Sequence, residues 1–179
     1  NTYEAHFQQH IKDAQGSNVA QSKGTVRISR PNKFNWKTTE PDLISVIADG
    51  KSLWNYDEDL AQVTQQPLKP VLKNSPAGIL AGDGNQLTES FNVSLGHHKQ
   101  CDATADQCFV LLPKSTDGQF SEMILSFQQG KLMDIHMTDG LGQHVHTHFT
   151  QVKINHAIAP KVFTFKPPKG VDIIHADSD

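Results

Sequence analysis

Apolar and polar side chains alternate along most of the chain, and this pattern predicts a sheet built from many strands. A period of two places successive side chains on opposite faces of a strand. Turn signals such as Asp49-Gly50 separate the alternating segments at short intervals, which favours antiparallel neighbours. The alternating segments are residues 3–11, 25–30, 34–38, 43–48, 52–56, 61–65, 91–95, 109–112, 120–127, 131–138 and 143–154, and a short strand with Phe163 and Phe165 in phase is predicted near the C-terminus.

The alternation stops between residues 67 and 90, where prolines and glycines surround short apolar groups. Pro76 suits the first position of a helix and Gly82 its end, so a single short helix is predicted between them. The apolar residues of this segment are too few to form a core of their own and must lie on the sheet. The segment is either a movable lid or a fixed surface loop with one helical turn.

Arg30 occupies a position where an apolar face should continue. It is in phase with Val26 and Ile28, the apolar side of its strand. A guanidinium on a core face costs several kcal/mol, on the order of the burial penalty of an unpaired charge, unless carbonyls or carboxylates accept its hydrogen bonds. Arg30 therefore either has a partner in another layer or lies beyond the sheet edge with its charge in water.

The bulk properties describe one domain of ordinary size. The chain has 179 residues, a net charge of -3 and a pI near 6.4, which gives no basic surface for nucleic acid. No apolar run reaches the roughly 18 residues of a membrane-spanning helix. The start of the chain does not resemble a signal peptide, so an exported form would already be processed.

Cys101 and Cys108 flank a polar loop of six residues. The pair could form a disulfide across the neck of a hairpin, worth about 2 to 3 kcal/mol in the chain-entropy description. Alternatively, the two thiols could bind zinc together with His97 and His98. The spacing alone leaves both interpretations open.

Three histidines, His144, His146 and His148, line one face of a predicted strand. Neighbours in such a row are about 7 Å apart, too far for all three to share one zinc ion without other strands. A solvated strand face is the simpler interpretation, against a metal-dependent enzyme. No catalytic motif is present elsewhere, so neither an enzyme nor a cofactor is predicted.

Three motifs carry a family resemblance. RPNKFNW, DGKSLWNYD and FTFKPPKGV occur in this order, and the sequence resembles the periplasmic outer-membrane lipoprotein carriers of the LolA family over nearly its whole length. The resemblance implies a mainly β fold with short helices, an antiparallel unclosed half β-barrel with a helical lid over a hydrophobic cavity. It implies one carrier domain over residues 1–179 with the lid at about 67–90. The N-terminal helix that normally contributes to that lid is expected to be missing.

The function implied by the resemblance is transport, not catalysis. Such a carrier binds the acyl chains of lipoproteins in the periplasm, receives them from an inner-membrane ABC lipoprotein exporter and delivers them to an outer-membrane acceptor, as a monomer. The rival interpretations are the outer-membrane acceptor itself and a lipid- or peptide-sensing module of an envelope-stress pathway. A periplasmic location also favours the disulfide over the zinc site.

The resemblance assigns roles to individual positions. In the family, the arginine of the RPN motif, here Arg30, holds the lid shut through lid carbonyls, for which Leu80 and Ala81 are the candidates. The aromatic residue after it, here Phe34, is important for lipoprotein transfer. The residues expected to face acyl chains are Val26, Ile28, Phe34, Trp36, Val46, Leu72, Ile79, Leu80, Phe91, Val93, Met133 and Ile135.

Overall fold

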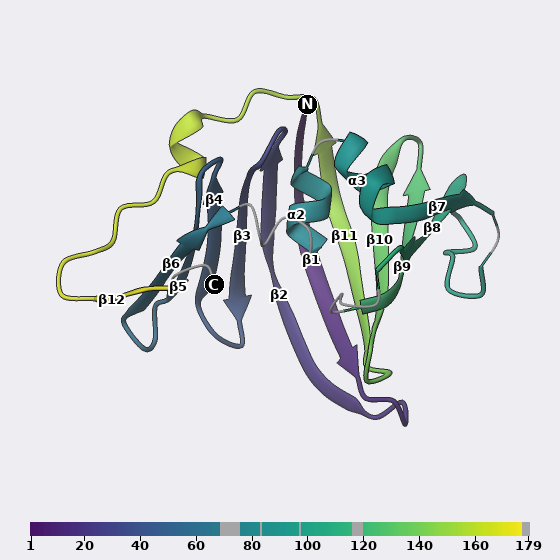
Figure 1. The fold of residues 1–179 in the computed structure, drawn as a ribbon, viewed down its shortest axis with the longest axis horizontal. Helices are drawn as coiled ribbons and strands as arrows, with labels where there is room; N and C mark the ends of the chain where they lie inside the picture. The colour runs from purple at the N-terminus through teal and green to yellow at the C-terminus, as the bar shows by residue number, and fades with distance from the viewer. Residues whose placement is uncertain (69–75, 83, 97, 116–119, 177–179) are drawn as a thin grey trace.

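The protein, described here by a computed structural model, is one open, mostly antiparallel sheet with its α-helices on one face (Figure 1). The structure describes residues 1–68, 76–82, 84–96, 98–115 and 120–176. The strands in this part of the chain are β1 (Thr2–Lys12), β2 (Asn18–Ser29), β3 (Lys33–Glu40), β4 (Ile44–Asp49), β5 (Ser52–Asp57), β6 (Gln62–Pro67), β7 (Phe91–Leu95), β8 (Gln107–Pro113), β9 (Phe120–Gln128), β10 (Lys131–Asp139), β11 (His144–Ile154) and β12 (Asp172–His175).

The order of strands across the sheet is β12-β6-β5-β4-β3-β2-β1-β11-β10-β9-β8-β7. Two meanders, β1 to β6 and β7 to β11, are joined at the centre by the antiparallel pairing of β1 with β11. The two ends of the sheet do not pair with each other, so the barrel stays unclosed, as predicted.

Two short helices, α2 (Pro76–Ala81) and α3 (Gly84–Ser90), lie over the inner face of the sheet (Figure 1). The buried side chains of α2, Ile79 and Leu80, belong to the same apolar core as Val26, Phe34 and the other inward residues of the strands. The alternation of apolar and polar residues explains why the inner face is the buried one. Inward positions such as Ala5 and Phe7 are apolar, while His6 and Gln8 point outward and are exposed. Within the described residues, no helix combines the length and apolar character that crossing a membrane requires.

Residues 155–171 carry the chain across the outer face of the sheet. A turn of 3-10 helix, η1 (Pro160–Phe163), packs on β3, where Asn35 Nδ2 donates to Val162 O at 2.8 Å. The ring of Phe165 then lies 5.6 Å from that of Trp54 and 5.5 Å from that of Tyr56. This segment therefore covers one half of the outer face.

The structure corrects the predicted strand through Phe163 and Phe165. Residues 160–163 form the 3-10 turn instead. The chain rejoins the sheet only at β12, which pairs in parallel with β6. Pro160 and the pair Pro167-Pro168 lack backbone donors, so this stretch cannot sustain strand pairing. The helix α3 was also not predicted, because its sequence GNQLTES is short and mostly polar.

A disulfide joins Cys101 to Cys108, with 6.0 Å between the two Cα atoms. The loop that it closes is bound to β9 by Asp102 N, which donates to Ser126 Oγ at 3.4 Å, and by Asp106 N, which donates to Phe127 O at 2.9 Å. Ile124 and Ser126 are 1% and 0% exposed although they alternate with the inward residues of β9. We infer that the disulfide loop covers this half of the outer face.

Candidate functional site

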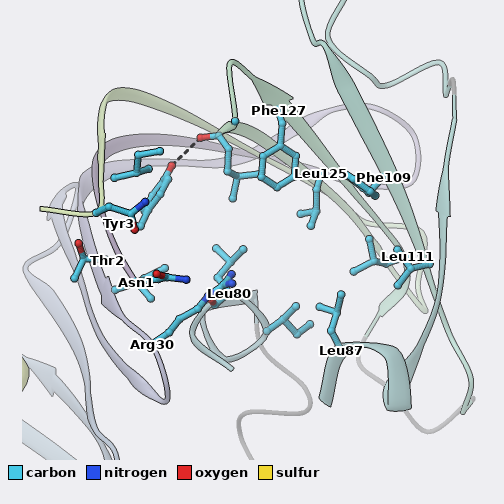
Figure 2. Close-up of a pocket in the computed structure, with 17 residues that line it drawn as sticks. Asn1, Thr2, Tyr3, Arg30, Leu80, Leu87, Phe109, Leu111, Leu125 and Phe127 are labelled. Atoms are coloured by element: carbon cyan, nitrogen blue, oxygen red, sulfur yellow. Dashed lines mark hydrogen bonds between the residues drawn. The ribbon is translucent and has the colours of Figure 1, made fainter. Parts of the chain in front are cut away.

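A cavity of about 400 Å³ lies between the inner face of the sheet and the helices α2 and α3 (Figure 2). Its wall is mostly apolar, because β8, β9 and β10 direct their inward side chains at it. The residues that line it are Asn1, Thr2, Tyr3, Ile28, Arg30, Ile79, Leu80, Leu87, Val93, Phe109, Leu111, Leu125, Phe127, Gly130, Leu132, Ile154 and Asn155.

Two hydrogen bonds fasten the end of α2 to the loop after β2. Arg30 Nε donates to Leu80 O at 2.7 Å, and the backbone N–H of Asn32 donates to Ala81 O at 2.8 Å. The last carbonyls of any helix lack partners within that helix. Here the donors of the loop satisfy them, and a cation also suits the negative end of a helix.

Arg30 is more exposed than the sequence argument assumed. It lies just beyond the last residue of β2, Ser29, and it is exposed, so the structure combines the two alternatives of the sequence analysis. The guanidinium therefore lies at the rim of the cavity, where it keeps much of its hydration while binding Leu80 O. The large desolvation cost of a fully buried cation does not arise.

Tyr3 places a hydroxyl group in the wall of the cavity. Its Oη donates to Leu132 O at 2.8 Å (Figure 2). Burial, and secondly the negative charge of Asp134, raise the pKa of Tyr3 well above its ordinary value. The phenol therefore stays neutral and acts as a donor.

The predicted acyl-contact residues divide into two groups. Ile28, Ile79, Leu80 and Val93 line the cavity together with Arg30. Apart from Met133, the others within the described residues lie in or against the core without lining the cavity: Val26, Phe34, Trp36, Val46, Phe91 and Ile135. Ala81, a latch candidate, is also in the core. Leu72 lies outside the described residues.

The expectation for Met133 is wrong. A bulge between Leu132 and Asp134 shifts the register of β10 against β9, so that Leu132, rather than Met133, joins Ile135 on the inner face. One inserted residue changes the phase of every side chain before it. Met133 itself is half-buried and is neither a lining residue nor a member of the core.

Several lining residues were missed, namely Tyr3, Leu87, Phe109, Leu111, Leu125, Phe127 and Leu132. Alternation does place those of the strands on the inner face. It does not distinguish an inward residue that fills the core from one that faces an empty space, because that depends on where the lid stops.

Two of the three histidines of β11 are hydrogen-bonded to an aspartate, while the third, His144, lies 3.0 Å from the hydroxyl of Thr138. His146 Nε2 and His148 Nδ1 each lie 2.8 Å from Asp134 Oδ1, and the ring of His146 stacks on that of His136 with centroids 4.0 Å apart. Among the described side chains, no three or more of His, Cys, Asp and Glu are arranged to hold a metal ion. This cluster lies on the outer face, opposite the cavity.

Comparison with known proteins agrees with this geometry. The profile of the family "Outer membrane lipoprotein carrier protein LolA" matches residues 1–166. A protein of Pseudomonas paraeruginosa named outer-membrane lipoprotein carrier protein is 39% identical over 173 residues, which are 97% of this chain and 81% of the relative. This match covers the cavity-lining strands and the lid together.

Solved structures give the same fold. An uncharacterized conserved protein from Thermus thermophilus superposes with a TM-score of 0.56 at 12% identity, over 98% of this chain and 91% of the other. A LolA superfamily protein from Nitrosomonas europaea gives 0.51 at 14% identity, over 92% and 90%. With a half-barrel, a lidded apolar cavity and a family match over residues 1–166, this chain belongs to the LolA family of outer-membrane lipoprotein carriers.

Proposed function

We propose that this protein carries lipoproteins through the periplasm by enclosing their acyl chains in the cavity beneath α2 and α3. The observation that supports this most is an apolar cavity of about 400 Å³ whose lid is fastened by Arg30 at 2.7 Å from Leu80 O. Relatives named as lipoprotein carriers supply the cargo class. The role is binding and release, with no covalent step.

The energetics require an enclosed cavity and a lid that moves. Each methylene group transferred from water to an apolar environment contributes about 0.8 kcal/mol of favourable free energy. Burial of a whole acyl chain in an apolar cavity is therefore strongly favoured. Small-molecule sites span roughly 300 to 1,000 Å³, and this cavity lies near the lower end of that range. A lipid with more than one chain therefore requires α2 to move away from the sheet.

In this mechanism Arg30 acts as a latch. Without cargo it binds Leu80 O and the lid is closed; cargo opens the lid and breaks the bond. A hydrogen bond from a charged donor is worth about 1.5 to 3 kcal/mol, and losing it offsets part of the cargo affinity. This makes release to an acceptor possible.

We further propose that one carrier domain spans residues 1–179 and works as a monomer. An inner-membrane ABC exporter would load it, and an outer-membrane acceptor would unload it. Ile28, Ile79, Leu80 and Val93 would contact the chains directly, since they line the cavity. Phe34, buried beside them in the core, would support the transfer step.

The test is Arg30→Leu with Arg27→Leu as its control. Arg27 lies on the outer side of the same strand and pairs with Glu4 at 3.0 Å, so the control removes the same charge away from the lid. Mass spectrometry of protein purified from the periplasm should find more bound lipoprotein on Arg30→Leu than on the parent. Transfer to an acceptor should slow by roughly tenfold, the effect of about 1.4 kcal/mol.

Arg27→Leu should load and transfer as the parent does. If Arg30→Leu hands cargo over at the parental rate, the latch is wrong. If no preparation contains lipoprotein, the carrier function itself is wrong.

A further inference from the structure

The cavity has a polar end and an apolar end. Figure 2 shows Asn1, Thr2 and Arg30 on one side, and Leu87, Phe109 and Leu111 on the other. The polar end lies where β1 begins and β11 finishes, because Asn155 N donates to Thr2 O at 2.9 Å. A molecule with a polar head and apolar tails would fit in one orientation.

The hydroxyl groups near the polar end are already used by the protein. Thr2 Oγ1 donates to His156 O at 2.6 Å, and Tyr3 Oη donates to Leu132 O at 2.8 Å. Among the hydrogen bonds of the described residues, the guanidinium of Arg30 donates only through Nε, while its backbone N–H donates to Asn1 O at 3.0 Å, and none involves the side-chain amides of Asn1 and Asn155. Among the described residues at the polar end, the donors that remain for a ligand are therefore the Nη groups of Arg30 and the side-chain amides of Asn1 and Asn155.

We propose, building on the carrier function above, that this polar end is a subsite for the ester carbonyl oxygens of the cargo's glyceryl group, and that a cargo carbonyl replaces Leu80 O on Arg30. The tails then extend toward Phe109, Leu111 and Leu125. Leu80 O and the ester oxygen are both neutral carbonyl acceptors. The bond to the ester therefore compensates part of the free energy that Arg30 loses when its bond to Leu80 O breaks, while Leu80 O itself loses its donor.

This exchange explains how cargo would open the lid. A ligand shifts a conformational equilibrium only if it binds the two states differently. A hydrocarbon chain alone contacts the apolar wall and does not compete for Arg30. A carbonyl placed at the rim competes directly with Leu80 O and so favours the open state.

The test compares two ligands that differ only in carbonyl groups. One is a glyceryl-cysteine dipeptide carrying two palmitoyl esters, and the other is its dihexadecyl ether analogue. Both are titrated against the protein loaded with diphenylhexatriene, a fluorescent hydrocarbon. The parent should bind the ester at least about tenfold more tightly than the ether, which is the lower end of what one hydrogen bond to a charged donor is worth.

Variants show which residues cause the preference for the ester over the ether. Arg30→Leu should bring the ester-to-ether ratio close to one, while Arg27→Leu keeps the parental ratio. Asn155→Gly should lower the ratio in part; glycine suits this position because Asn155 has a φ of 55°. Since the ratio is measured within each variant, a general loss of affinity does not affect it.

The amide of Asn32 reports on the lid directly, because it donates to Ala81 O. Its hydrogen exchange should accelerate with the ester and stay slower with the ether. Equal affinities in the parent, or a preference that survives in Arg30→Leu, would overturn the subsite and leave the carrier function standing. Failure of both ligands to displace the probe would overturn the carrier function as well.

Discussion

Gly24 shows how closely the strands approach at the centre of the inner face. It lies opposite Phe7 on β1 and Thr38 on β3. A Cβ atom built on Gly24 would lie 1.9 Å from Lys37 O and 2.9 Å from Cε1 of Phe7. Neither neighbour can retreat easily, because one is strand backbone and the ring of Phe7 packs on Trp36 with centroids 4.6 Å apart.

Gly24→Ala should therefore destabilise the protein by roughly 1 to 3 kcal/mol or more, the usual cost of overpacking a core. Urea unfolding followed by tryptophan fluorescence measures this. Gly96→Ala is the matched control, since a Cβ atom there meets nothing within 4 Å. Equal unfolding midpoints for the two variants would contradict the strand contact described above.

At the scale of single residues, Arg30 and Met133 show what the sequence could and could not predict. The phase of Arg30 predicted a partner in another layer, the family resemblance placed that partner on the lid, and the structure has the bond to Leu80 O. The phase did not reveal that β2 ends at Ser29, which leaves Arg30 at the rim and exposed. Met133 was misplaced for a related reason, because a bulge leaves no signal in alternation alone.

At the scale of elements, β10 and β11 build a network of ionisable groups on the outer face. Burial alone would raise the pKa of Asp134, but the hydrogen bonds and positive charges of His146 and His148 outweigh it and lower that pKa. Burial, followed by the charge of His146, lowers the pKa of His136 to about 4. Asp134 opposes that shift, while the loop residue His98 adds to it and Asp102 reduces it.

The shift of His136 predicts acid sensitivity. An unfolded histidine takes up its proton near pH 6.5, whereas folded His136 stays neutral down to about 4. The unfolded state then binds more protons, so stability falls as the pH drops from about 6.5 to 4. His136→Gln should flatten this part of the curve in urea unfolding at several pH values.

His175→Gln serves as the control, because His175 is exposed on β12, at the edge of the sheet far from β10 and β11. It should keep the parental pH dependence. A His136→Gln protein that loses stability as steeply as the parent between pH 6.5 and 4 would show that other groups are responsible.

The elements were predicted well where alternation was long and poorly where it was absent. The long strands β1 and β11 match their predicted segments closely, whereas β2 begins at Asn18, well before the segment 25–30 that was predicted for it. By contrast, α3 and η1 depend on contacts with the sheet rather than on their own sequences, so the chain around them gave no periodic signal. The strand β12 was not predicted for the same reason, because it depends on pairing with β6, which is far away in sequence.

At the scale of the whole molecule, the two faces of the sheet are covered differently. The inner face carries the core and the cavity under α2 and α3, while the outer face is covered by residues 155–171 at one side and by the disulfide loop at the other. The sequence predicted a sheet with a lid. It did not predict the outer coverings, because segments without alternation do not indicate which face they cross.

The pairing of β1 with β11 also governs how the chain can fold. Tyr3 lies opposite Ile154, so the middle of the sheet joins residues from the two ends of the chain. Such distant contacts slow folding, commonly to milliseconds or seconds. In pulsed hydrogen exchange the amides of β1 that face β11 should gain protection in the slowest phase, after those between β3 and β4. Until β11 has been synthesised, one edge of β1 has no partner strand, so during synthesis this edge is exposed to pairing with the wrong strand and to aggregation.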